Sequence, residues 1–125
     1  MPHVVMVDRF GLWADGVKKI LRNFGVDAVV DVVGMEQQDL LEIQALRPDV
    51  VCIDAASVGA WDFADQIGRC WPSARVVMCV VASDQLLTKQ VIRRGWSCLT
   101  ADMSGSDVMA IFRFTDSRNR TIRDA

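Results

Sequence analysis

The sequence is poor in the residues that support metal, redox or nucleotide chemistry. Its 125 residues include one histidine, His3, and four cysteines, no two of which have the C-x-x-C spacing. A zinc site or a redox dithiol is therefore not expected. Because His3 precedes the first apolar run, no Ser-His-Asp or Cys-His catalytic set is expected around it. Neither G-x-G-x-x-G nor G-x-x-x-x-G-K-S/T follows that run, which disfavours a nucleotide-dependent or other cofactor enzyme.

Charge and hydropathy set further limits. The formal net charge is −2 and the sequence pI is about 5.2, so the composition does not favour nucleic acid or a membrane surface as a partner. The apolar run after His3 is too short for a signal peptide, and no run is long enough to span a bilayer. We therefore expect one cytoplasmic domain, in which 51% apolar residues suffice for a packed core.

Five short apolar runs, rich in valine and with little alternation, recur along the chain. This pattern is typical of strands that are buried on both faces of a parallel sheet. The runs are Val4 to Val7, Ala28 to Val33, Val50 to Ile53, Val76 to Val81 and Cys98 to Ala101.

Stretches with helical spacing separate these runs. Gly25 and Pro48 are expected to follow the ends of the first two helices. Ser83-Asp84 is expected to cap the fourth helix, and Ser104 or Ser106 the fifth. The side chains expected to face inward are Leu12, Val17, Ile20, Leu21 and Phe24, then Leu40, Leu41 and Ala45, then Phe63, Ile67 and Cys70, then Leu87, Val91 and Ile92, and finally Val108, Ile111 and Phe112.

This alternation predicts an α/β domain of the flavodoxin-like (βα)5 kind, with a five-stranded parallel sheet between two layers of helices. The strand order 2-1-3-4-5 is the common solution at this size. We assign residues 1–114 to this domain. Residues 115–125, where the pattern ends, are expected to form a polar linker or tail.

The order of the strands predicts where a site should lie. In such a sheet, ligands bind beyond the carboxyl ends of the strands, where the strand order reverses between the first and third strands. Asp8 and Arg9 follow the first strand, and Asp54 follows the third. Two carboxylates and a guanidinium are therefore expected to meet there in an acidic pocket. The alternative is a solvated loop at each strand end.

Four segments, in order and at matching spacings, resemble receiver domains of NarL/LuxR-type response regulators. Residues 8–17 (DRFGLWADGV) are similar to D-D-H-P-L-F-R-E-G-L, and residues 46–54 (LRPDVVCID) resemble L-R-P-D-V-V-L-L-D. Residues 74–78 (ARVVM) resemble A-R-V-V-V, and residues 94–96 (RGW) stand where the family has A-G-A. The resemblance extends from Val4 to about Phe114. It implies that Asp54 corresponds to the phosphoacceptor aspartate.

The chain departs from that family at the positions that the resemblance assigns to phosphorylation. Arg9 replaces the second of two adjacent acids that hold Mg²⁺, and a guanidinium offers only donors and a positive charge. Val80 replaces the hydroxyl at the end of strand four. At the end of strand five, Asp102 replaces a lysine, and three residues before it Leu99 replaces an aromatic residue. The resemblance thus implies degenerate switch positions at these three residues, no metal site, and weak or absent Mg²⁺ binding.

Arg9 has two interpretations. It pairs with Asp8 and Asp54 as a built-in cation, or it is a surface arginine beside a degenerate cleft. We favour the first, because Arg9 takes the place of the metal. Losing one electrostatic contributor costs about 2.7–4 kcal/mol in comparable sites, and three are missing here. Even with Arg9 as a phosphate clamp, efficient phosphotransfer to Asp54 is not expected.

The resemblance predicts a non-enzymatic, atypical receiver domain that acts in signal transduction and regulates transcription. We expect it to act through a homodimer or another signalling protein, with the fourth helix, fifth strand and fifth helix as the contact surface and the first helix as the next choice. A small-molecule effector is a further option, no cofactor is expected, and DNA would be bound only through an attached output module. The alternative function is a receiver that a histidine kinase phosphorylates at Asp54.

Other features have simpler interpretations. The cysteines are expected to be small, buried apolar residues. Trp96 is expected to be a packed lid over the sheet edge or, if exposed, an interface anchor. Lys89, Arg93 and Arg94 form either a solvated helix face or a docking patch.

Overall fold

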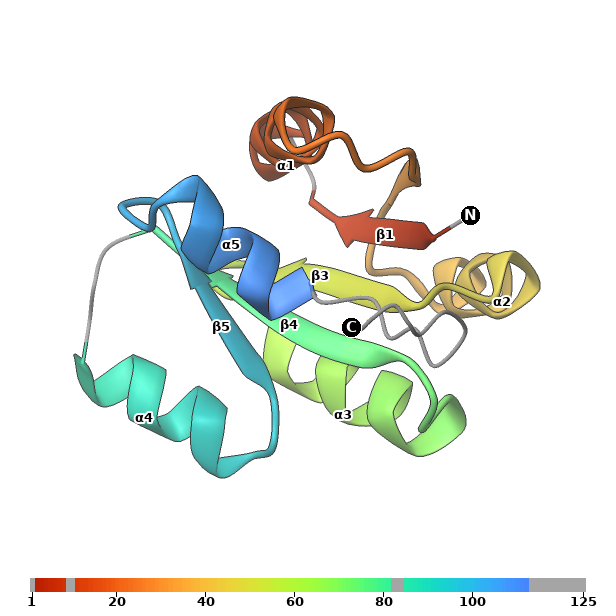
Figure 1. The fold of residues 1–125 in the computed structure, drawn as a ribbon. Helices are drawn as coiled ribbons and strands as arrows, with labels where there is room; N and C mark the ends of the chain where they lie inside the picture. Colours follow the sequence, from red (N-terminus) through yellow and green to blue (C-terminus); the bar gives the residue numbers. More distant parts are fainter. Residues whose placement is uncertain (1, 9–10, 82–84, 113–125) are drawn as a thin grey trace.

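The protein folds as a five-stranded parallel sheet between two layers of helices (Figure 1). The structure, a computed structural model, describes residues 2–8, 11–81 and 85–112. The strands are β1 (His3–Val7), β2 (Val29–Val33), β3 (Val50–Asp54), β4 (Arg75–Val80) and β5 (Ser97–Thr100), in the order β2-β1-β3-β4-β5. The predicted fold class and strand order are confirmed, and each end of every predicted strand lies within one residue of the observed one.

The helices divide between the two faces of the sheet (Figure 1). Helices α1 (Leu12–Asn23) and α5 (Gly105–Phe112) cover one face, and α2 (Gln37–Leu46), α3 (Ala60–Cys70) and α4 (Gln85–Arg93) cover the other. In β1, Val4 and Met6 face the first layer, whereas Val5 and Val7 face the second. Both sets are buried, which explains why the sequence of β1 barely alternates. The edge strand β2 was also predicted to be buried on both faces and is not, because Val29 is 40% and Val32 is 46% exposed. Within the described residues, no helix has the length and apolar character needed to cross a bilayer.

Several side chains predicted to face inward do not. In α2, Leu41 is 70% exposed and Ala45 is exposed, whereas Ile43 is fully buried. The sequence of α2 has apolar residues on more than one side, so its spacing does not define a single buried stripe.

The remaining errors fall at helix ends. Cys70 is the exposed last residue of α3, which also corrects its assignment as a buried cysteine. Ile92, in the last turn of α4, is 60% exposed, and Phe24, directly after α1, is also exposed. Ile92 directly follows the fully buried Val91, and consecutive residues of a helix point about 100° apart, so the two side chains do not share the buried side of α4.

The ends of the helices follow the predicted chemistry. Gly25, just beyond α1, has a φ of +73°, which suits glycine. At the start of α5 the Asp107 N–H donates to Ser104 Oγ at 3.1 Å, so Ser104 and not Ser106 caps this helix. The predicted cap Ser83-Asp84 and the predicted tail at residues 115–125 lie outside the described residues.

Candidate functional site

Strand register brings two of the predicted site residues together. Strands β1 and β3 are parallel neighbours with Val7 opposite Ile53. Asp8 and Asp54, the next residue on each strand, therefore leave the same edge of the sheet side by side. This edge lies where the strand order reverses, as predicted. Arg9, predicted to lie between the two carboxylates, is outside the described residues.

The Asp8 carboxylate is bonded to the first turn of α1. It is only 2% exposed, and its Oδ2 accepts hydrogen bonds from the backbone N–H groups of Trp13 at 2.6 Å and Ala14 at 3.2 Å. The residue before α1 is Gly11, which has a φ of +71° and no side chain that could cap the helix. Asp8 therefore satisfies helix donors that would otherwise lack partners, and the helix dipole favours its negative charge.

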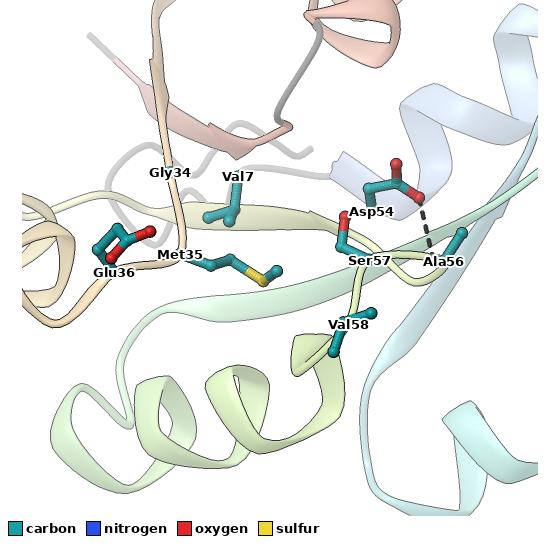
Figure 2. Close-up of a pocket in the computed structure, with 8 residues that line it drawn as sticks. All are labelled: Val7, Gly34, Met35, Glu36, Asp54, Ala56, Ser57 and Val58. Carbon is teal, nitrogen blue, oxygen red and sulfur yellow. Dashed lines mark hydrogen bonds between the residues drawn. The ribbon is translucent and has the colours of Figure 1, made fainter.

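Asp54 has a different environment at the end of β3. Its carboxylate is half-buried, and Oδ1 accepts a hydrogen bond from the Ala56 N–H at 3.1 Å (Figure 2). The Ser57 N–H donates to the Asp54 carbonyl oxygen at 3.1 Å. These bonds are local to the turn after β3. The side chain is thus oriented by its own loop and not by a neighbouring cation among the described residues.

A cavity of about 600 Å³ opens beside Asp54, between the loops that follow β2 and β3 (Figure 2). The lining residues are Val7, Gly34, Met35, Glu36, Asp54, Ala56, Ser57 and Val58. Val7 and Met35 make part of the wall apolar, and Glu36 and Asp54 provide carboxylates. Asp8 is not among them, because its carboxylate is turned toward α1. The lining favours a small group that is cationic or rich in hydrogen-bond donors.

Two buried thiols lie below the acidic edge. Cys52 on β3 and Cys79 on β4 are both buried on the α1–α5 side of the sheet, as predicted for them. The hydrogen bond with Cys52, burial, and the nearby charges of Cys52, Asp54 and Asp8 raise the pKa of Cys79 well above its ordinary value of 9.0. Both carboxylates therefore lie close enough to act on the same thiol. A thiol held neutral in this way is inert as a nucleophile.

The three predicted switch positions offer no hydroxyl, aromatic or cationic group. Val80, at the end of β4, and Leu99, in β5, are both buried apolar residues. Asp102 is exposed, and its Oδ1 accepts a 2.7 Å hydrogen bond from Thr100 Oγ1. Thr100, the last residue of β5, was not among the predicted site residues. A hydroxyl residue at the end of a predicted strand is visible in the sequence and could have been included.

The donor set for a divalent cation is small. Among the described residues, no group of three or more His, Cys, Asp or Glu side chains is placed to hold a metal ion. The resemblance to receivers implies a second acid directly after Asp8, and the sequence has Arg9 there. Asp8 and Asp54 alone do not make up that set, and Asp8 Oδ2 already accepts two backbone hydrogen bonds.

The basic residues near the end of α4 have two different environments. Lys89 and Arg93 are exposed, as expected for a solvated helix face. Arg94 instead contacts Asp65, Trp61 and Trp96. Trp96 is half-buried against the core cluster on the α2–α3–α4 side, which agrees with a packed lid.

Comparison of the fold with solved structures finds similar proteins, whereas comparison of the sequence does not. The sequence matches no protein-family model and no curated protein. The signal receiver domain of a DNA-binding response regulator from Colwellia psychrerythraea 34H superposes with a TM-score of 0.73 at 15% identity, covering 90% of this chain and 96% of that chain. A CheY-like protein from Pseudomonas aeruginosa PAO1 gives 0.72 at 16% identity, covering 90% and 98%. A response regulator receiver domain protein from Clostridium thermocellum gives 0.72 at 15%, covering 90% and 92%. The chain therefore has the fold of response-regulator receiver domains.

Proposed function

We propose that this protein is an atypical receiver module that signals by contact with other proteins and does not use phosphorylation of Asp54 as its switch. The observation that carries the proposal is the environment of Asp8. Its carboxylate is buried and holds the first turn of α1 through two backbone N–H groups. An acid engaged in this way, and followed by Arg9 in the sequence, is a poor ligand for Mg²⁺.

The surroundings of Asp54 support the same proposal. A phosphoryl group on this residue would need cations and donors to offset the charge on its oxygens. Val80 and Leu99 are apolar, and Asp102 carries a negative charge where the resemblance implies a lysine. At about 2.7–4 kcal/mol for each missing contributor, an aspartyl phosphate here would form poorly. We therefore expect weak or absent Mg²⁺ binding and no other cofactor.

The proposed output is a protein contact that includes α4, β5 and α5. Two large apolar side chains of α4, Leu86 and Ile92, are exposed. Exposed apolar groups of this kind are what a docking surface requires. The partner is a second copy of the chain or another signalling protein. Transcription control would need an attached DNA-binding module; the similar receiver domain from Colwellia psychrerythraea belongs to a DNA-binding response regulator.

One observation favours a second candidate function. Asp54 is only half-buried and lines the 600 Å³ cavity together with Ser57, so that a phosphodonor can reach it. In this alternative, a histidine kinase phosphorylates Asp54, and Arg9 stands in for Mg²⁺. The same cavity is the place where a small-molecule effector would bind in a phosphorylation-independent protein.

Beryllofluoride, an analogue of the phosphoryl group, separates the two functions. The purified protein is titrated with beryllofluoride and Mg²⁺ while its backbone amide spectrum is recorded, with Asp54→Asn as the matched control. We expect no specific shift at residues 54–57. Shifts that centre on Asp54, Ala56 and Ser57, and that are lost in Asp54→Asn, would establish the phosphoacceptor function instead.

A further inference from the structure

Four side chains join the end of α4 to α3. Arg94 directly follows α4, and its Nη1 lies 3.0 Å from Oδ2 and 3.2 Å from Oδ1 of Asp65 on α3. The Arg94 guanidinium carbon lies 5.4 Å from the ring centroid of Trp61 and 5.3 Å from that of Trp96. The two indole rings contact each other, with centroids 5.5 Å apart and planes tilted by 55°. One cation therefore lies against two aromatic rings and a carboxylate.

These contacts depend on one another. Arg94 and Asp65 are 48% and 39% exposed, and an ion pair this exposed contributes little when it stands alone. Contact with two rings adds cation–π attraction, and both tryptophans pack against the buried cluster below them. Each of these interactions changes an equilibrium constant by a factor of about two to five. Because all of them involve Arg94, loss of one partner weakens the others.

Helix α4 packs along β5 with one side, and most of its other residues are exposed. Of the nine residues in this helix, all of which the structure describes, Val91 is the only fully buried one. Leu86 and Ile92 are exposed, and the Thr88 hydroxyl contacts the Cys98 thiol at 3.7 Å. A helix of this length is marginal without tertiary contacts. The Arg94 cluster therefore adds a side-chain contact with α3 to the packing of Val91 at the C-terminal end of α4.

We propose that Trp61, Asp65, Arg94 and Trp96 form a latch that fixes α4 against α3, and that opening of the latch frees α4 as a unit. The role given to α4 as a contact surface rests on the proposed function. None of the four residues lines the cavity at Asp54. The conformation of this surface is thus controlled by a contact between two helices and does not require a phosphoryl group.

Hydrogen exchange of the purified protein tests the latch directly. The latch variants are Asp65→Asn and Arg94→Gln. The chain offers matched controls in Asp62→Asn on α3 and Arg93→Gln on α4, whose exposed side chains make no ion pair among the described residues. We expect the latch variants to speed exchange of the amides of α4 about five- to twentyfold, with α1 unchanged. The controls should change it less than about twofold.

Two further measurements test whether the four residues act together. The double variant Asp65→Asn/Arg94→Gln should exchange little faster than either single variant, because both break the same contact. Trp61→Phe should remove the exciton signal of the paired indoles from the circular dichroism spectrum and speed exchange in α4.

The latch proposal is wrong if the α4 amides of the latch variants exchange no faster than those of the controls. It is also wrong if exchange rises equally in α1 and α4, because that would indicate loss of global stability. Neither a partner nor a phosphoryl analogue is present in these experiments. A negative exchange result would therefore reject the latch without changing the beryllofluoride result. A positive beryllofluoride result would likewise reject the proposed function without changing the exchange result.

Discussion

Asp8 Oδ2 lies 2.6 Å from the backbone nitrogen of Trp13, a hydrogen bond that ties the end of β1 to the start of α1. This contact gives the acid a structural role that does not require a metal. It explains how an aspartate can be needed at this position while Arg9, and not a second acid, follows it. Of the two aspartates at this edge, Asp8 thus caps a helix, whereas Asp54 lines the adjoining cavity.

Removal of the Asp8 carboxylate should destabilise the fold. In Asp8→Ala two backbone N–H groups of α1 lose their acceptor, and we expect the free energy of unfolding to fall by about 1–2 kcal/mol. Asp8→Asn keeps an oxygen acceptor and should lose about half as much. Urea unfolding measures both values.

Asp27→Ala is the matched control for these variants. Asp27 is an exposed loop acid, so its replacement makes the same change in net charge without breaking a cap. If Asp8→Ala proves as stable as the native protein, or more stable, repulsion between Asp8 and Asp54 outweighs the capping bonds, and the structural role assigned to Asp8 is wrong.

Arg9→Asp should create a weak Mg²⁺ site. The substitution gives two adjacent acids beside Asp54 and removes a positive charge that repels the ion. At a Mg²⁺ concentration ten times the dissociation constant, bound metal would stabilise the variant by about 1.4 kcal/mol. Thermal unfolding and tryptophan fluorescence with and without Mg²⁺ measure the effect. Arg9→Gln, which removes the charge but adds no carboxylate, should not respond; an equal response in both variants would contradict the explanation.

The buried thiol of Cys79 should make stability fall at alkaline pH. Its pKa is raised in the folded state, chiefly by the hydrogen bond with Cys52 and by burial, above the ordinary value of 9.0. Below that value the thiol is protonated in both states and stability is unaffected. Above it the unfolded chain loses the proton while the folded chain keeps it, so the free energy of unfolding falls by up to about 1.4 kcal/mol per pH unit.

Cys79→Ala separates this effect from the titration of lysines. The variant should be less stable at neutral pH because it leaves a small cavity, but its stability should fall less steeply above pH 9 or so. Denaturant unfolding at a series of pH values gives both slopes. Identical slopes in the native protein and the variant would show that Cys79 ionises equally in both states.

Gly105 and Phe24 should be energetically coupled. A Cβ atom on Gly105 would lie 2.8 Å from Cε1 of Phe24, so that the ring must move to accommodate it. We expect Gly105→Ala to destabilise the native protein by about 0.5–1 kcal/mol. With Phe24→Ala already present, Gly105→Ala should become neutral or stabilising, since alanine has a higher helix propensity than glycine. A double-mutant cycle measures the coupling, and additive effects would rule it out.

Most of the fold could be predicted from the sequence because its signals are local. Valine-rich runs such as Val50 to Ile53, separated by helical spacing, predict the parallel strands, and the strand order follows from the arrangement most common at this size. The errors lie where local spacing does not determine burial. Leu41 is exposed because α2 is apolar on several sides, and Ile92 is exposed because the adjacent Val91 occupies the side of α4 that faces the core.

The site could be predicted less completely. Topology placed Asp8 and Asp54 at the same edge, and the register of β1 and β3 agrees. The capping bonds of Asp8 could not be foreseen, because the sequence does not show whether an aspartate at a strand end binds a metal ion or accepts hydrogen bonds from a helix. The pairing of Arg94 with Asp65 is equally hidden, since the two residues are 29 positions apart and lie on different elements.

The most direct test of the account is an attempt to phosphorylate Asp54. The purified protein is incubated with acetyl phosphate and Mg²⁺, and its intact mass is then measured beside that of Asp54→Asn. We expect the native protein to gain no phosphoryl group under conditions in which a conventional receiver domain is labelled. A gain of one phosphoryl group that is absent from Asp54→Asn would contradict this expectation.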